Sequence, residues 1–205
     1  LRRPISAPPK VHELIAERLR PLDPASVEVL RMLAVTDGMP LTVLRYEVPT
    51  EQLAHLEGLG LATLDTSGPE HRVTLVHDLH REVLLSSSHF SLVGARERAV
   101  RALGRAPADG GHDLLAARLS LEIGRPDPER HLRASHRARR AWDNELAFAL
   151  ATAAFDAGAG EPALLARAAA LGALGRTGEA HELFDLLEHS ADLGIAAEAV
   201  TARAM

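Results

Sequence analysis

The sequence predicts a mainly α-helical protein built from two modules, and three observations carry this prediction. Ala and Leu dominate the composition while aromatic residues make up only 3% of the chain, which is typical of helices that pack through small side chains. Apolar residues recur with helical spacing along most of the 205 residues. Gly and Pro interrupt this pattern repeatedly, and only one short stretch has the alternation of a β-hairpin.

The first module is expected over residues 11–104, after a Pro-rich linker at residues 1–10. Its first helix is indicated by apolar residues that recur on one helical face, namely Val11, Leu14, Ile15 and Leu19. The dipeptide Asp23-Pro24 then supplies a helix cap and a first-turn proline. The run from Ala25 to Val35 is apolar on nearly all sides, so we expect it to be the central buried helix of this module.

Short helices are predicted after Pro40 and over Thr50–Leu59, and a β-hairpin follows them. The hairpin consists of Leu61–Leu64 and Arg72–Val76 around a turn rich in Ser, Gly and Pro. Helices followed by such a hairpin have the order of a winged-helix domain. Further helices are expected from Asp78 onwards and up to about Leu103, completing the module.

A linker is predicted at residues 105–111, and the second module at residues 112–205. Helical segments separated by Gly or Pro recur there, near 112–124, 127–142, 143–157, 161–175, 177–189 and 192–205. The segment 161–188 resembles the tetratricopeptide pattern, with small residues at the helix crossing and Phe184 filling the gap between them. Leu164 and Leu171 replace the aromatic residues usual in the first helix of that pattern. The second module is therefore expected to be a truncated array of tetratricopeptide-like helical hairpins.

The most specific local string is Val76-His77-Asp78, where the hairpin leads into a Leu-rich helix. This string resembles the Met-His-Asp site in the winged-helix domain of the STAND class of signal-transducing ATPases. That class includes the large ATP-binding LuxR-type, MalT-like bacterial transcriptional regulators. The resemblance covers residues 11–104, and more loosely the remainder, because bacterial members continue into tetratricopeptide-like arrays.

The resemblance implies that His77 contacts the β-phosphate of ADP and holds the protein in a closed state, with Asp78 as its structural partner. An imidazole can donate a hydrogen bond to phosphate, and Asp78 can cap the following helix. The nucleotide, ATP or ADP, would be bound by an upstream ATPase domain of the parent protein, with further repeats and a DNA-binding domain downstream. The alternative is that His77 and Asp78 only form a helix cap with a neighbouring imidazole.

A basic stripe is a second candidate surface. Its members recur at helical spacing and end beside the only tryptophan of the chain: Arg130, Arg133, Arg137, Arg140 and Trp142. Such a stripe is either a solvated helix face or a surface for an acidic partner, an effector anion or phosphate. Trp142 is either a binding anchor or part of the core.

Composition excludes several functions. The chain has no cysteine, so thiolate chemistry and disulfides are absent, and Lys10 is its only lysine. A phosphate-binding P-loop needs a lysine inside a folded element, so the chain itself holds no nucleotide and no cofactor. We find no nucleophile motif or metal-binding spacing, and expect no enzyme activity. No apolar stretch is long enough to span a membrane, and a cytoplasmic location is expected.

The resulting hypothesis is a regulatory fragment of a bacterial transcriptional regulator. It would couple the nucleotide state of the ATPase domain to binding of an effector or protein partner on the helical repeats. One alternative is an interaction scaffold of helical repeats without nucleotide linkage. The other is an autonomous winged-helix DNA binder, which is disfavoured because the helix in the recognition position carries Glu51 and Glu57 and no Arg or Lys, and the net charge is -5.

Overall fold

The computed structural model describes residues 8–86, 88–106 and 110–203. Within these residues the structure is mainly helical, with 12 helices and a small three-stranded antiparallel sheet, so the prediction of a mainly α protein is confirmed. The chain divides into two compact units, Leu1–Pro107 and Ala108–Met205. The predicted linkers at 1–10 and 105–111 lie partly outside the described residues. The first predicted linker is wrong at its end, because Lys10 lies inside the first helix.

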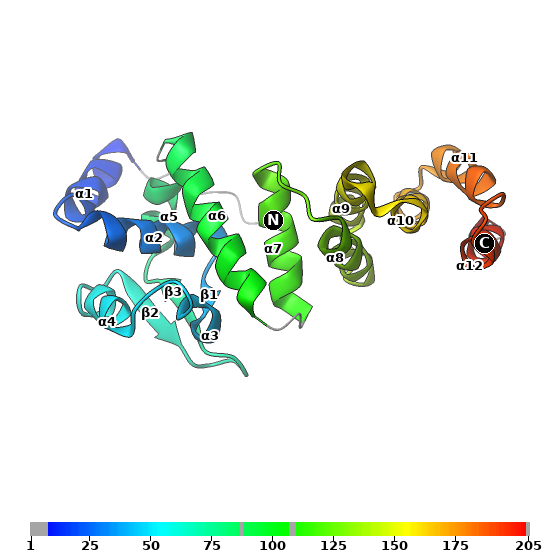
Figure 1. Cartoon of the computed structure of the whole chain (residues 1–205). Coiled ribbons are helices and arrows are strands. Elements are labelled where there is room, and N and C mark those ends of the chain that lie inside the picture. The colour runs from blue at the N-terminus through cyan, green and yellow to red at the C-terminus, as the bar shows by residue number, and fades with distance from the viewer. Residues whose placement is uncertain (1–7, 87, 107–109, 204–205) are drawn as a thin grey trace. The chain divides into compact units, whose positions relative to one another are not determined.

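The first unit contains six helices and three short strands within its described residues (Figure 1). In chain order they are α1 (Pro9–Leu19), α2 (Pro24–Thr36), β1 (Met39–Pro40), α3 (Leu41–Leu44), α4 (Thr50–Gly58), β2 (Ala62–Asp65), β3 (Arg72–Leu75), α5 (Asp78–Leu85) and α6 (His89–Arg105).

Helix α2 forms the centre of this unit. The carboxylate of Asp23 fixes its start by accepting hydrogen bonds from the backbone N–H and the hydroxyl of Ser26, at 2.9 and 2.7 Å. Helices α5 and α6 and strand β3 pack around α2. Its buried apolar residues are Val29, Leu30, Met32, Leu33 and Ala34. Burial of each large side chain contributes about 1.5–3 kcal/mol, so α2 supplies much of the core of this unit.

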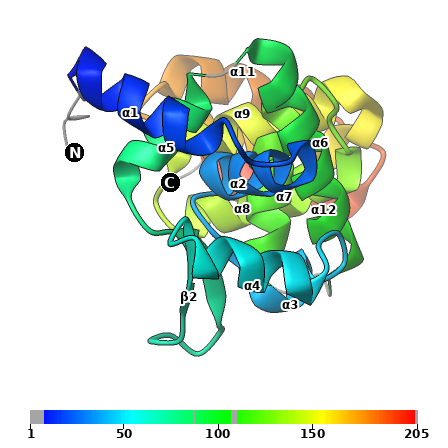
Figure 2. The ribbon, with the colours of Figure 1, turned by 90° about the vertical axis from the view of Figure 1, so that its left-hand side faces the viewer.

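The sheet has the strand order β1-β3-β2. Strand β3 pairs with β2 on one side, with Ala62 opposite Leu75, and with β1 on the other, with Met39 opposite Val73. Figure 2 shows the β2–β3 hairpin extending beyond α4. The hairpin was predicted, but β1 was not, because two residues are too few to show strand alternation.

The second unit consists of helices that pack in sequence on one another. They are α7 (Gly110–Glu122), α8 (Pro128–Arg140), α9 (Asn144–Ala154), α10 (Glu161–Ala173), α11 (Thr177–Leu187) and α12 (Leu193–Arg203), with a π-type turn, Phe155–Ala159, after α9. Alternate helices also meet, since α10 contacts both α8 and α12. Each helix pair therefore packs against the next pair, which makes a continuous layered array.

Alanine dominates the packing of this array. One buried cluster joins α7, α8, α9 and α10 and consists of Ala117, Ala134, Ala138, Ala147, Leu150 and Ala170. A second cluster is built around Phe184, which packs with Ala168, Leu171 and Ala180 as the sequence indicated. Small side chains let helix backbones approach closely, so the low aromatic content is compatible with a dense core. Within the described ranges, no helix has the length and apolarity needed to cross a membrane.

Two glycines offer a matched test of the first unit. Gly38 has a positive φ of 89°, and a Cβ there would lie 2.7 Å from the methyl carbon of Thr74. Gly94 lies inside α6, where a Cβ would meet nothing within 4 Å. We therefore expect Gly38→Ala to lower the free energy of unfolding by roughly 2–4 kcal/mol, through strain and overlap.

Gly94→Ala should instead raise the free energy of unfolding by about 0.5–1 kcal/mol, because alanine favours the helix interior. Urea denaturation of both variants measures the two changes. Equal effects of the two substitutions would contradict the described path of the chain between α2 and β1.

Candidate functional site

His77 lies between β3 and α5, in the position that caps the helix. Its backbone is extended (φ -135°, ψ 137°), but its side chain makes no capping hydrogen bond. Asp78 is the first residue of α5, one position later than the cap that the sequence analysis assigned to it. Its carboxylate there faces the positive end of the helix dipole. Both side chains are exposed.

A polar pocket of about 240 Å³ opens beside His77. It lies where the end of α2, strand β3 and the start of α5 meet, and its polar lining includes Asp37, Thr74, His77, Asp78 and Arg81. The volume is below the ~300–1,000 Å³ that encloses a typical small ligand. The pocket therefore has room for one small polar group but not for a whole nucleotide, and the carboxylate of Asp78 also lines it.

Arg81 holds the walls of this polar pocket together. Its Nε donates a hydrogen bond to the carbonyl oxygen of Ala34 at 2.9 Å, and its Nη1 lies 3.2 Å from Oδ1 of Asp37. These contacts tie α5 to the end of α2, where Asp37 has a left-handed backbone with φ 55°. These contacts leave other guanidinium N–H groups of Arg81 available, and the exposed imidazole of His77 adds a further donor to this pocket.

His80 lies behind His77, with 5.4 Å between the ring centroids. It is only 3% exposed, and its Nδ1 is buried without a hydrogen-bond partner. Burial, followed by the charges of His77 and Arg18, lowers the pKa of His80, so this ring is neutral at pH 7. Among the described residues, no group of three His, Asp or Glu side chains could hold a metal ion.

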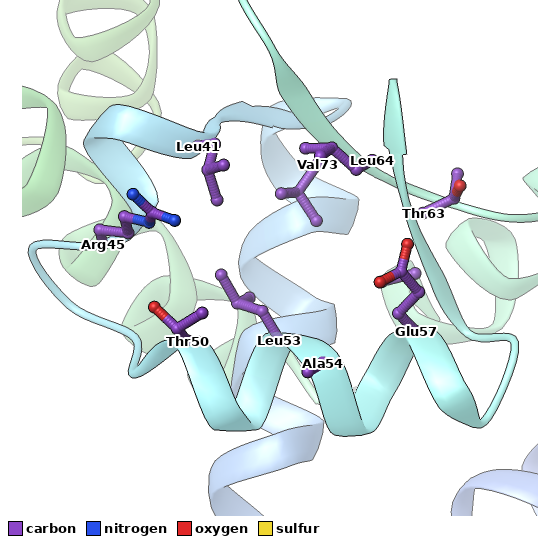
Figure 3. A pocket seen from close by; sticks show the side chains of 10 residues that line it. Leu41, Arg45, Thr50, Leu53, Ala54, Glu57, Thr63, Leu64 and Val73 are labelled. Carbon is purple, nitrogen blue, oxygen red and sulfur yellow. The ribbon is translucent and has the colours of Figure 1, made fainter. Parts of the chain in front are cut away.

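A second, apolar pocket of about 160 Å³ lies between α3, α4 and the hairpin (Figure 3). Leu41, Leu53 and Val73 line it, while Arg45 and Glu57 stand at its two ends. It has room for a single apolar side chain. The adjoining surface of α4 exposes Glu51 and Glu57, and this negative charge opposes an approach to DNA phosphates.

The structure divides the predicted basic stripe on α8. Arg130 and Arg133 both turn toward Asp113 of α7, with Nε to carboxylate distances of 3.2 Å. The Asp113 side chain is only 5% exposed, so these two ion pairs fasten α7 to α8. Sequence spacing could not identify Asp113, because a helical stripe reveals neighbours on one helix and not partners on another.

The end of α8 keeps its positive charge. Arg139 and Arg140 are exposed, and neither makes an ion pair within the part of the chain that the structure describes, whereas Arg137 is half-buried. Loss of hydration, and then the charges of Arg139 and Arg140, lower the pKa of the adjacent His136. Arg139 was not among the predicted site residues, although it belongs to this end of the helix.

Trp142 follows directly, and its indole is 85% exposed. It has a left-handed backbone with φ 62°, inside a turn closed by a 3.0 Å hydrogen bond from the N–H of Asp143 to the carbonyl of Ala138. Four other helices end in the same way, with a hydrogen bond from the N–H after the left-handed residue to the carbonyl five residues earlier. Their left-handed residues are Asp37, Gly60, Gly124 and Gly175. This position usually holds glycine or asparagine, because a Cβ there clashes with the backbone. A bulky tryptophan in this place is exceptional.

A scan against protein-family models matched no family, and searches of curated proteins and of solved structures returned no match either.

Substitutions at Trp142 test whether the fold needs its indole. We expect Trp142→Gly to raise the free energy of unfolding by about 0.5–1 kcal/mol, because relief of left-handed strain outweighs the added freedom of the unfolded chain. Trp142→Ala keeps a Cβ, and so keeps the strain, while it removes the indole. It should leave stability within about 0.5 kcal/mol of the original chain. Destabilisation by both substitutions, measured by urea denaturation, would show that the indole packs against the fold.

Proposed function

We propose that this chain is the regulatory part of a STAND-class bacterial transcriptional regulator, in which the first unit is a winged-helix domain and the second a tetratricopeptide-like array. The order α2-β1-α3-α4-β2-β3 supports the first assignment. The layered packing of α8 to α12, with Phe184 among small residues, supports the second. The chain would couple the nucleotide state of an ATPase domain in the same polypeptide to partner binding on the array.

One observation carries the nucleotide half of this proposal. The imidazole of His77 is exposed beside the polar pocket and does not cap α5. The simple structural interpretation of the His-Asp pair, a cap with a satisfied imidazole, therefore loses its main support. A histidine that the local fold leaves open is available to donate a hydrogen bond to phosphate.

The size of the polar pocket suggests how His77 would act. A space of about 240 Å³ accepts one phosphate group, so the rest of the nucleotide would lie in the ATPase domain. Arg81 and Asp37 would keep the end of α2 and the start of α5 together as a rigid support for His77. The nucleotide would then favour a closed state, and a partner bound to the array would favour an open state.

A scaffold without nucleotide linkage is the second candidate, and one observation favours it. The exposed Trp142 belongs to the second unit, whereas His77 belongs to the first. The acidic surface of α4 disfavours the third hypothesis, direct DNA binding, because it would repel DNA phosphates.

The variant His77→Ala tests the nucleotide half in the polypeptide that carries both this chain and its ATPase domain. Loss of a hydrogen bond to a charged phosphate costs about 1.5–3 kcal/mol, so release of ADP should accelerate by about ten-fold or more. Release of a fluorescent ADP analogue measures this rate.

The matched control is His71→Ala, because His71 is exposed in the same unit but outside the polar pocket. It should leave the rate of ADP release unchanged. Equal rates for His77→Ala and the unmodified protein would return His77 to a structural role and leave the scaffold as the better account.

A further inference from the structure

The placement of Trp142 has no explanation within the fold. Its backbone occupies a conformation that disfavours any side chain, and its indole is 85% exposed. Three of the four equivalent turns have glycine at this position, namely at Gly60, Gly124 and Gly175. Left-handed strain at a bulky residue is typical of functional sites, where a side chain is presented to a ligand.

Two arginines that make no ion pair among the described residues precede Trp142 in the chain. Arg139 and Arg140 are exposed, and they make no ion pair among the described residues. Their charges reach His136 and oppose its protonation. Arg130 and Arg133, earlier on the same helix, are both paired with Asp113, and Arg133 also lies 3.9 Å from Glu129. Helix α8 thus carries two arginines that bind α7 and, at its end, two arginines that are exposed to solvent.

We propose that a surface patch binds an acidic polypeptide segment in which carboxylates flank an apolar side chain. This Trp142 patch consists of Arg139, Arg140 and Trp142. Guanidinium groups bind carboxylates with two parallel hydrogen bonds, and an indole offers a large apolar contact at small entropic cost. Tryptophan and arginine are also the residues that most often dominate the energy of protein interfaces. Charge complementarity therefore identifies the partner as acidic.

The surroundings of the Trp142 patch favour a peptide over a nucleic acid. Asp143, next in the chain, points its carboxylate at the start of α9, where it accepts a hydrogen bond from the N–H of Leu146. Glu145 is exposed two residues later. A continuous row of phosphates would be repelled by these two carboxylates, whereas the one or two carboxylates of a peptide can be placed at the arginines alone.

This inference names the partner class for the binding half of the proposed function, and it does not depend on the nucleotide half. A chain with His77→Ala should bind the acidic segment as well as the unmodified chain does. Failure of the Trp142 patch would leave the role of His77 untouched, and the reverse also holds.

Fluorescence offers a direct test, because Trp142 is the only tryptophan in the chain. The probe is a short synthetic peptide of alternating Glu and Leu, titrated into the full chain. We expect a blue shift of the emission as the indole leaves water, and weaker binding at higher salt. A peptide of alternating Lys and Leu should give no shift.

Variants then assign the effect to residues, with a dye-labelled probe peptide followed by fluorescence anisotropy. Trp142→Gly, and the double variant Arg139→Gln with Arg140→Gln, should each weaken binding by roughly ten-fold or more. The control Leu193→Ala removes another exposed apolar side chain of the same unit, 83% exposed, and should bind normally. Because Trp142→Gly is expected to fold at least as well as the original chain, its loss of affinity cannot be attributed to unfolding.

Three results would overturn the proposal. The first is an unchanged emission spectrum with the Glu–Leu peptide, or unchanged affinity of the Trp142→Gly chain. The second is tighter binding of single-stranded DNA than of the acidic peptide, which would assign the surface to nucleic acid. The third is a blue shift that grows with protein concentration alone, which would identify a second copy of this chain as the partner.

Discussion

One backbone constraint recurs in both units of this protein: a helix ends in a left-handed residue. The N–H of the next residue then donates a hydrogen bond to the carbonyl five positions earlier. This turn ends α2, α4, α7, α8 and α10. It satisfies free carbonyl groups at the helix end and reverses the chain so that the next element packs against the one before. Both candidate sites depend on it, since Asp37 lies in the turn beside the polar pocket and Trp142 lies in the turn after α8.

The same turn serves two purposes in the two units. At the end of α2, Arg81 binds both the carbonyl of Ala34 and the carboxylate of Asp37, so the left-handed residue helps to fix the pocket beside His77. After α8 nothing in the described chain holds the left-handed residue by its side chain, and the indole of Trp142 is directed into solvent. Contacts within the fold explain Asp37, whereas we propose that binding to a partner explains Trp142.

The sequence predicts the helices well, because their apolar spacing and their Gly and Pro boundaries are local signals. It also indicates the hairpin and the packing of Phe184. It does not reveal β1, which exists only because Met39 and Pro40 pair with β3. Nor does it reveal that Asp113 forms ion pairs with Arg130 and Arg133, since those contacts join two helices. The left-handed state of Trp142 escapes prediction because no glycine marks it.

The central claim is that Trp142 is displayed and not packed, and quenching of its fluorescence by acrylamide tests this claim most directly. The single tryptophan makes the signal unambiguous. The structure predicts emission close to that of indole in water and quenching nearly as efficient as that of a free tryptophan derivative. Blue-shifted emission that acrylamide quenches poorly, in dilute protein without a partner, would contradict it.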